Sequence, residues 1–594
     1  MRQTLLRVAS LLPLLLPGSI GNAEAQPRFP DPGYYLFPVR EVAGYFSANF
    51  GEMRPDHFHS GVDVKTDGTV GKPVVAAAEG YVSRIFCSPS GYGRALYVVH
   101  PNGTTSVYGH LQSFAPDIEA FFQAERYRLH RNRIDISCDS TQFPVQRGQE
   151  IGRSGNTGNS FGPHLHYEIR DNRTGQTLNT IAARILRPKD RIPPLIQRLH
   201  YVEIDTVAGV PVHAPLQSYD LERTPAGEYR LKGVPAVDAG TKGYFIVEAS
   251  DRKEDVSNTF GIYRLQAAVD GEPWFEYRMD GFSFDHSRYC NAASYYPMQA
   301  ASRNEVIRLA LPEGGIGDFH PILRNRGIVT AAPGQRREVV VEVTDDCGNR
   351  SVLRFTLAGR TPRNDFQARI DSTASIIRHD RPFRHEWEGL SLVMPKGALY
   401  ESCFYRPARS TRTLRRDTTV IVLSPLYEWL DASVPLHGAV SLSIRTFVPE
   451  ELRRHVSLAL RTRNGGLSFL GGRYEHGAVT GRIRKTGTIV AVADTVAPRI
   501  RPQFAEGADL SGRERLTVRL SDNFSGIESC SATIDGEWVP LDYSPVQGTA
   551  TVTFDRRMSG GRTDSTAPQS HVLTITATDG CGNRARCVIG FRYR

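Results

Sequence analysis

Two short stretches decide how this sequence is read: DHFHSGVD at residues 56–63 and GPHLHYE at residues 162–168. Side chains two positions apart in a strand point to the same face, so His164 and His166 share a face. If the first stretch is extended, His59 and Asp63 share a face as well. Two imidazoles and one carboxylate are a typical protein complement of a catalytic zinc ion, whose fourth position is left to water. The two stretches together predict a zinc site.

Three motifs follow one another over roughly residues 35–175. They are HSGVD at 59–63, YGHL at 108–111 and GPHLH at 162–166. Between them lie GKPVVAA at 71–77, EG at 79–80, GYG at 91–93 and IGRSGNTG at 151–158. In these motifs and in their order, the segment resembles the lysostaphin/LytM-type zinc endopeptidases, which are peptidoglycan hydrolases. The resemblance covers under a third of the chain.

The resemblance, rather than the strand period, decides the role of each histidine. It implies that Zn2+ is held by His59, Asp63 and His166. It also implies that His110 and His164 act on the bound water and on the charge that develops at the attacked carbonyl oxygen. Of the histidines at 164 and 166, the second is the metal ligand in that family and the first is catalytic.

The function that the resemblance implies is an exported zinc metalloendopeptidase that hydrolyses peptide cross-links of bacterial peptidoglycan. The sequence has no His-Glu-x-x-His motif, because His385-Glu386 is followed by Trp-Glu-Gly. The usual glutamate base is therefore missing, which makes the histidine pair more necessary. Some relatives have degenerate sites and are non-catalytic regulators that activate cell-wall amidases, but the complete motif set favours an enzyme here. A third hypothesis makes the later β modules, as an adhesin or scaffold, the main function.

Several neighbouring residues leave alternatives open. His57 also forms a His-x-His pair with the next histidine, although it fits the ligand spacing less well. Arg54 and Glu168 are candidates for residues that support the ligands from behind. Tyr108 could form a hydrogen bond in the cleft or pack in the core. Asn49 lies upstream of the first motif, where some relatives place an asparagine that blocks the metal.

Composition places the chain among multidomain globular proteins. Its 594 residues predict three to five domains, and 40% hydrophobic with 23% charged residues is ordinary for folded protein. The net charge of +9 comes from dispersed basic residues, which favours a solvated surface over a nucleic-acid site. A mildly positive protein also suits an anionic wall polymer such as peptidoglycan. The sequence leaves the oligomeric state open.

The first 25 residues are typical of a secretory signal, which predicts a periplasmic or cell-envelope location. Arg2 and Arg7 precede a short apolar run, and Ala-Glu-Ala at 23–25 fits a cleavage site. The run is too short to span a bilayer, and no other transmembrane candidate is present. Disulfides can form in an exported protein. We therefore expect Cys87 and Cys138, the only two cysteines of the catalytic domain, to pair.

The chain is predicted to be mainly β: an antiparallel catalytic domain at residues 26–190 followed by β-sandwich modules. An insert at 113–143 interrupts the family pattern and is expected to hold a short helix between residues 118 and 129, near the cleft. An internal repeat follows. The pieces ASD, VDGE and VTDDCGN at 249–251, 269–272 and 343–349 match LSD, IDGE and ATDGCGN at 520–522, 534–537 and 577–583.

The repeat predicts two immunoglobulin-like modules at 196–360, with an insertion, and at 498–594. Another β module is expected between them at 365–490. By analogy, such modules on an exported peptidase bind or space it from the wall. The aspartates of the repeat, Asp345, Asp346 and Asp579, could bind calcium, although they are foremost typical of turns.

Overall fold

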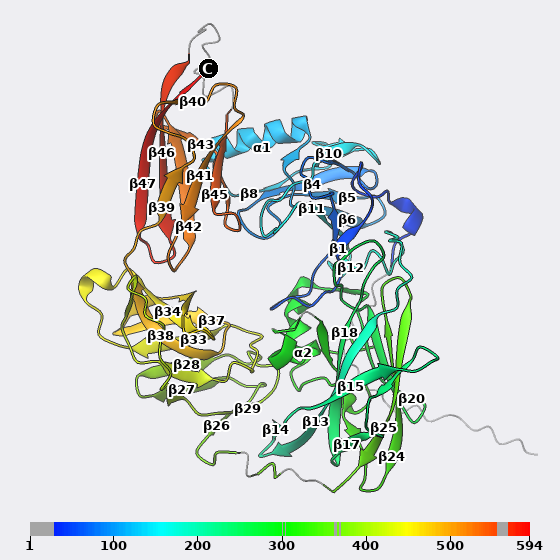
Figure 1. The fold of residues 1–594 in the computed structure, drawn as a ribbon. Coiled ribbons are helices and arrows are strands. Elements are labelled where there is room, and N and C mark those ends of the chain that lie inside the picture. The colour runs from blue at the N-terminus through cyan, green and yellow to red at the C-terminus, as the bar shows by residue number, and fades with distance from the viewer. Residues whose placement is uncertain (1–28, 300, 303, 362–364, 368–369, 555–567) are drawn as a thin grey trace, which may run out of the picture.

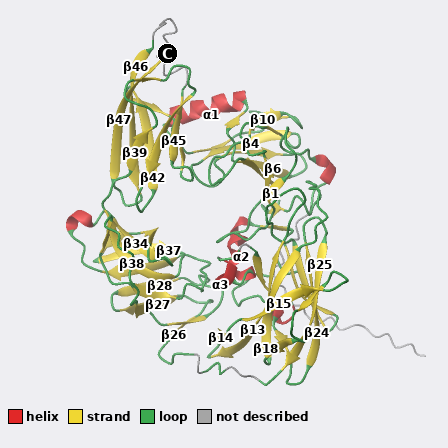
Figure 2. Cartoon of the chain, in the orientation of Figure 1, coloured by secondary structure: helices red, strands yellow, loops and turns green. Residues whose placement is uncertain are grey.

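The computed structural model describes residues 29–594 apart from 300, 303, 362–364, 368–369 and 555–567. The predicted signal segment at 1–25 lies outside these residues. Strands dominate the fold and helices are few and short, as Figure 2 shows, so the mainly β prediction is confirmed. Across the described part of the chain, no helix is long and apolar enough to cross a membrane.

The N-terminal region, residues 29–190, is built on one antiparallel sheet with the strand order β1-β2-β11-β6-β5-β4-β8. A small sheet, β3-β10-β7, lies beside it, and the insert forms helix α1. The main strands are β1 Phe46–Ala48, β2 Val62–Lys65, β11 His164–Asp171, β6 Thr104–Gly109, β5 Arg94–Val99, β4 Gly80–Cys87 and β8 Ile134–Ser137. The other elements are β3 Pro73–Val75, β10 Glu150–Arg153, β7 Ser113–Phe114, β9 Pro144–Val145, β12 Thr177–Leu178 and α1 Pro116–Leu129.

The second module, residues 195–359, holds a large sheet with the order β20-β19-β24-β25-β16-β15-β13-β18-β22. Its strands are β13 Leu195–Val207, β15 Gln217–Arg223, β16 Tyr229–Leu231, β18 Lys242–Ser250, β19 Arg264–Val269, β20 Glu272–Arg278, β22 Glu305–Arg308, β24 Arg336–Thr344 and β25 Arg350–Gly359. Strand β21 Gly281–Phe282 leaves this module and pairs with β12 of the N-terminal region. The short helices η2 Phe284–Tyr289 and α2 Cys290–Ala293 follow it.

The third module, residues 374–494, has two larger sheets, β27-β28-β33-β37-β36 and β30-β32-β38-β34-β35, and a two-stranded sheet of β26 Ser375–Ile377 and β29 Cys403–Tyr405. Its strands are β27 Phe383–Trp387, β28 Leu390–Met394, β30 Ala408–Arg409, β32 Tyr427–Leu430, β33 Val440–Arg445, β34 Val456–Arg461, β35 Leu467–Gly471, β36 Arg473–Glu475, β37 Ala478–Ile483 and β38 Gly487–Asp494.

The last module, residues 498–594, has two sheets, β39-β41-β45-β44 and β40-β47-β46-β42-β43. Its strands are β39 Arg499–Pro502, β40 Ala508–Asp509, β41 Arg515–Ser521, β42 Ile527–Ile534, β43 Glu537–Val539, β44 Asp542–Ser544, β45 Thr549–Thr553, β46 Gln569–Asp579 and β47 Arg584–Tyr593.

The N-terminal region and the second module share one hydrophobic core, whereas the third and last modules have cores of their own. Phe58 lies between His57 and His59 in the sequence. Its ring packs on those of Phe282 and Phe319 in the second module, with ring centres 5.6 Å and 5.0 Å away respectively. Burying rings of this size is a major source of stability, so the two regions support each other. The predicted domain boundaries stay a prediction.

Figure 1 shows the modules following one another around a ring, so that the last module returns to α1. Asp542 of β44 bridges Arg94 and Arg126 at 2.8 Å each, and Trp538 stacks on His130 just after the helix. The predicted helix in the insert is therefore present. Its predicted place near the cleft is wrong, because no residue of 113–143 lines the cleft around the histidines and α1 instead packs against the last module.

The predicted disulfide between Cys87 and Cys138 is also wrong. In the β4–β8 pair, Cys87 lies opposite Ile134, while the amide of Cys138 donates to the carbonyl of Ser83. The two cysteines are thus about four residues apart along the ladder, or about 13 Å, beyond the Cα separation of about 7 Å that a disulfide tolerates. All eight cysteines are free thiols.

Candidate metal centre and its cleft

Antiparallel pairing of β2 with β11 creates the centre. The register places His166 directly opposite Asp63, and the neighbouring strand β6 ends with Gly109 opposite His166. His59 reaches the same point from the segment before β2. The backbone at Gly61 passes so close to β11 that only glycine fits there. A Cβ on Gly61 would lie 2.4 Å from the carbonyl oxygen of Tyr167 and 2.9 Å from Nε2 of His166.

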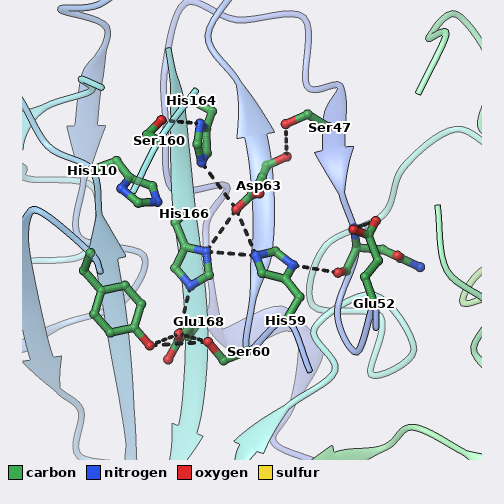
Figure 3. Close-up of polar contacts among 12 residues, drawn as sticks. Ser47, Glu52, His59, Ser60, Asp63, His110, Ser160, His164, His166 and Glu168 are labelled. Atoms are coloured by element: carbon green, nitrogen blue, oxygen red, sulfur yellow. Dashed lines mark hydrogen bonds and ion pairs between the residues drawn. The ribbon is translucent and has the colours of Figure 1, made fainter. Parts of the chain in front are cut away.

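Three donor atoms converge in the group defined by His59, Asp63 and His166, as Figure 3 shows. Nε2 of His59 lies 3.1 Å from Nδ1 of His166, and Oδ1 of Asp63 lies 3.2 and 2.9 Å from these two nitrogens. A tetrahedron with zinc–ligand bonds of 2.0–2.1 Å has edges of about 3.3 Å. The three atoms therefore fit one face of a zinc tetrahedron in spacing and in chemistry.

The second nitrogen of each ligand histidine is already bound. Nδ1 of His59 donates to the backbone carbonyl of Asn49 at 2.8 Å, and Nε2 of His166 donates to Oε1 of Glu168 at 2.8 Å. Such partners fix the ring orientation and leave the lone pair of the other nitrogen for a metal. Both lone pairs then point into the group with Asp63.

Asn49 holds the ring of His59 through its backbone carbonyl, and its side chain is bound by the second module. Its side-chain amide donates to the carbonyl of Gly261 at 2.9 Å and to Asp346 at 3.2 Å, while its oxygen accepts from the amide of Gly261. It is buried in the contact with the second module. The hypothesis of a blocking asparagine is therefore wrong, and the residue instead links His59 to the second module.

Glu168 is fully buried and supports His166 from behind, the role for which the sequence made it a candidate. It accepts hydrogen bonds from Ser60 and Tyr92 at 2.6 Å each and from Arg170 at 2.6 and 2.8 Å. Burial opposes its charge, but Arg170 and these hydrogen bonds hold the pKa of Glu168 below its usual range. The side chain is therefore an anion at neutral pH and strengthens the histidine as a metal ligand.

His110 and His164 lie beside the three-residue group, with ring centres 4.7 Å apart. Nδ1 of His110 donates to the carbonyl of Thr157 at 2.7 Å, and Nδ1 of His164 donates to the carbonyl of Gly162 at 2.8 Å. Both Nε2 atoms therefore keep a lone pair that can take a proton. Burial, with His164 and His166 nearby, lowers the pKa of His110 to about 3, so its imidazole is neutral at pH 7.

His110 also has an uncommon backbone conformation. Its φ is 59°, in the left-handed region, immediately after the last residue of β6. Non-glycine residues adopt this region rarely, and such strain gathers at functional sites. Nε2 of His164 lies 3.6 Å from Oδ1 of Asp63, farther than Nδ1 of His166 at 2.9 Å. Of the pair, His166 is thus the member that completes the donor group.

The remaining sequence candidates lie outside the donor group. His57 is exposed and pairs with Asp56 at 2.8 Å, and Arg54 pairs with Glu52 at 2.8 Å. Tyr108 is buried in the core, where its hydroxyl accepts from the amide of Ala77. The core interpretation of Tyr108 is therefore the better one.

The repeated aspartates form two further groups. In the first copy, the ammonium of Lys253 lies among Asp190, Asp251 and Asp346 and offsets part of their charge. At the junction of the third and last modules, the carboxylates of Asp522 and Asp579 lie within 4.8 Å of one another and of Asp494, the last residue of β38. Phe524 follows Asp522 where Lys253 follows Asp251, so this copy lacks the internal cation. Calcium binding there stays a prediction.

The donor group lies in a cleft of about 940 Å³ that the N-terminal region and the second module line together. The described lining carries two side chains of permanent positive charge, Arg54 and Lys65, and one carboxylate, Asp63. Two exposed aromatic rings, Phe161 and Phe284, border it. With a divalent ion bound, the cleft would favour an acidic ligand. Sequence reasoning missed Asn49 as a positioning residue and missed Arg170 and Phe284 altogether, because their roles depend on contacts between distant segments.

The comparisons with known proteins identify the N-terminal region. Residues 57–121 and 123–179 match peptidase family M23, and residues 374–494 match the Zu5-like domain. The segment 57–179 is thus similar to M23 peptidases, and the third module is similar to Zu5-like domains.

Two curated relatives each match about a quarter of the chain. The DD-carboxypeptidase/endopeptidase Mpg of Neisseria meningitidis serogroup B is 32% identical over 131 residues, which are 22% of this chain and 24% of that protein. An uncharacterized metalloprotease of Haemophilus influenzae is 31% identical over 161 residues, or 26% and 28% of the two chains. The chain thus spans only about a quarter of the length of these relatives. A solved zinc-containing peptidase from Vibrio cholerae matches 25% of this chain and 38% of its own, at 23% identity and a TM-score of 0.19.

Proposed function

We propose that this chain is an exported zinc metalloendopeptidase that hydrolyses peptide cross-links of bacterial peptidoglycan. The observation that carries the proposal is the convergence of His59, Asp63 and His166 beside two further histidines whose Nε2 lone pairs remain available. A degenerate, regulatory relative has no reason to keep all five side chains in this arrangement.

The chemistry requires a metal that the donor set fits. A bound zinc ion would acidify a water molecule and polarise the attacked carbonyl. The chain itself supplies three further actions. Glu168 and Asn49 hold the ligand rings in place, and the carbonyls of Thr157 and Gly162 fix the tautomers of His110 and His164.

The histidine pair then handles the proton. Nε2 of one ring accepts the proton that water loses on attack, and the protonated ring can return it to the departing amine. The other ring, when protonated, would stabilise the negative charge on the oxygen of the attacked carbonyl. Burial keeps His110 neutral at pH 7, so the lone pair of its Nε2 is free.

The substrate class rests on the similarity to the M23 peptidases and on the lining of the cleft. Lys65 and a bound divalent ion would give the cleft a positive character that suits the carboxylates of a wall peptide. Arg54 adds less, because Glu52 pairs with it. The signal segment predicted from the sequence supports a location in the periplasm or cell envelope, where that polymer lies.

Digestion of purified peptidoglycan by the mature protein, followed by mass analysis of the soluble fragments, tests the proposal. We expect peptide-bond cleavage products, and we expect none from the His59→Ala variant. A wild-type protein that releases nothing but increases hydrolysis by an added amidase would instead establish the regulator. Fragments from cleavage at sugar bonds would contradict the reaction class.

A further inference from the structure

The second module supplies part of the cleft wall. Asn258, Phe284 and Ser287 line the cleft although all three lie outside the segment that matches the peptidase family. Phe284 is 41% exposed, which is unusual for a large apolar ring fixed in a short helix. Exposed apolar surface at the rim of a cleft is a common mark of a binding site.

Phe284 contacts Arg170, a side chain that supports the candidate metal centre from behind. The guanidinium of Arg170 lies 4.5 Å from the centre of the Phe284 ring. Arg170 binds Glu168, and Glu168 accepts the hydrogen bond of His166. The ring is therefore connected to a ligand histidine through two charged side chains, one of which stacks on it.

The backbone of this wall is also anchored. Phe282, two residues before Phe284, pairs with Thr177 in the β12–β21 ladder. Its ring packs on Phe50 and Phe58, with ring centres 5.3 and 5.6 Å apart. Phe284 thus projects from a rigid base, so its exposure is not the result of a loose loop.

A second exposed ring borders the other end of the same strand. Phe161 is 92% exposed, lines the cleft and lies three residues before His164, where β11 begins. Arg170, which stacks on Phe284, is six residues further along β11. Six steps along a strand span about 20 Å. His166 lies between residues 164 and 170, so along the strand the donor group lies between the two aromatic positions. An extended peptide of about six residues covers the same length.

We propose that Phe161 and Phe284 bind the substrate peptide on opposite sides of the scissile bond, which makes the second module part of the substrate-binding site. This inference rests on the proposed function, because it takes the wall peptide as the occupant of the cleft. The ligand is an extended, carboxylate-bearing peptide with apolar groups on both sides of the cleaved bond.

Steady-state hydrolysis of a purified cross-linked muropeptide dimer tests the inference. Phe284→Ala and Phe161→Ala should each raise KM about tenfold, the scale of losing one aromatic contact, with kcat and zinc content close to wild type. Phe284→Tyr keeps the ring and should restore the wild-type KM. The matched control is Phe447→Ala, since Phe447 is 81% exposed but lies in the third module and does not line the cleft.

Binding of the same dimer to His164→Ala protein, measured by calorimetry, separates the two proposals. If wild type hydrolyses neither the dimer nor the wall, the proposed function fails, yet weaker dimer binding on adding Phe284→Ala would still support the contact. If Phe284→Ala leaves both KM and dimer binding unchanged, the inference is overturned while the proposed function stands. Loss of zinc in Phe284→Ala would also overturn it, because the ring would then only support the metal centre.

Discussion

Glu168→Gln probes the support behind the metal centre with almost no change in shape. The carboxylate is fully buried and accepts from His166, Ser60, Tyr92 and Arg170. An amide keeps one acceptor oxygen, but its NH2 group faces the donors of Arg170 and its charge is gone. Because the pKa of Glu168 is held below its usual range by Arg170 and its hydrogen bonds, the variant removes a charge that exists at neutral pH.

Two magnitudes follow. Removing one member of a buried ion pair typically costs 3–5 kcal/mol, and since Arg170 keeps 20% of its side chain exposed we expect the lower end, about 3 kcal/mol, in unfolding free energy. Loss of the partner of a ligand histidine lowers metal affinity about 10–100-fold. The matched control is Glu150→Gln, whose partner Arg153 and own side chain are both largely exposed, so the loss should stay under about 1 kcal/mol.

Urea unfolding and zinc competition against a chromogenic chelator measure the two effects on the same preparations. We expect Glu168→Gln to move both quantities and Glu150→Gln to move neither. If Glu168→Gln binds zinc as tightly as wild type, His166 does not depend on this hydrogen bond for its role. Loss of stability with unchanged zinc affinity would make Glu168 a structural anchor only.

His110→Ala and His164→Ala should keep zinc and fold but lose turnover about a hundredfold or more, as measured by elemental analysis and wall hydrolysis; release of metal by His164→Ala would exchange its role with that of His166. Asn49→Ala removes the link from His59 to Gly261 of the second module and should weaken zinc binding about tenfold in the same competition assay, whereas tighter binding or higher activity would indicate a blocking role. The contact of Asp542 with Arg94 and Arg126 should weaken in acid. Burial opposes the Asp542 charge, but the two arginines lower its pKa to about 2, so its stabilisation is present above the ordinary aspartate pKa near 4 and is lost as pH falls toward 2. Small-angle scattering should show the ring opening over that window, and Asp542→Asn should remove this pH-dependent step; an unchanged wild-type profile would show that the contact does not close the ring.

The donor group could be predicted from sequence because a family resemblance supplied its residues and a local strand period supported the pairing of two of them. The period of two along a strand places His164 and His166 on one face, and three motifs in order specify which segments meet. Pairing of β2 with β11 then brings Asp63 opposite His166. Short-range patterns of this kind carry their own geometry.

What the sequence could not provide depends on contacts between distant segments. The pair Asn49–Gly261 and the stack of Arg170 on Phe284 join residues more than a hundred positions apart. No local period indicates them. The predicted place of the insert was wrong for the same reason. Its helix could be predicted from the local pattern, but its contact with Asp542 of the last module could not. The disulfide prediction was wrong because the number of cysteines does not determine strand register. The β4–β8 register separates Cys87 from Cys138 along the ladder.

The most direct test of the central claim is wall hydrolysis by chelator-treated protein during back-titration with zinc, with bound metal counted by elemental analysis. The account predicts that activity disappears with the metal and returns in proportion to zinc, with full activity at one ion per chain. It also predicts that His59→Ala, Asp63→Ala and His166→Ala each lose most of the bound zinc. Hydrolysis that survives complete removal of metal, or full zinc occupancy in any of the three variants, would contradict it.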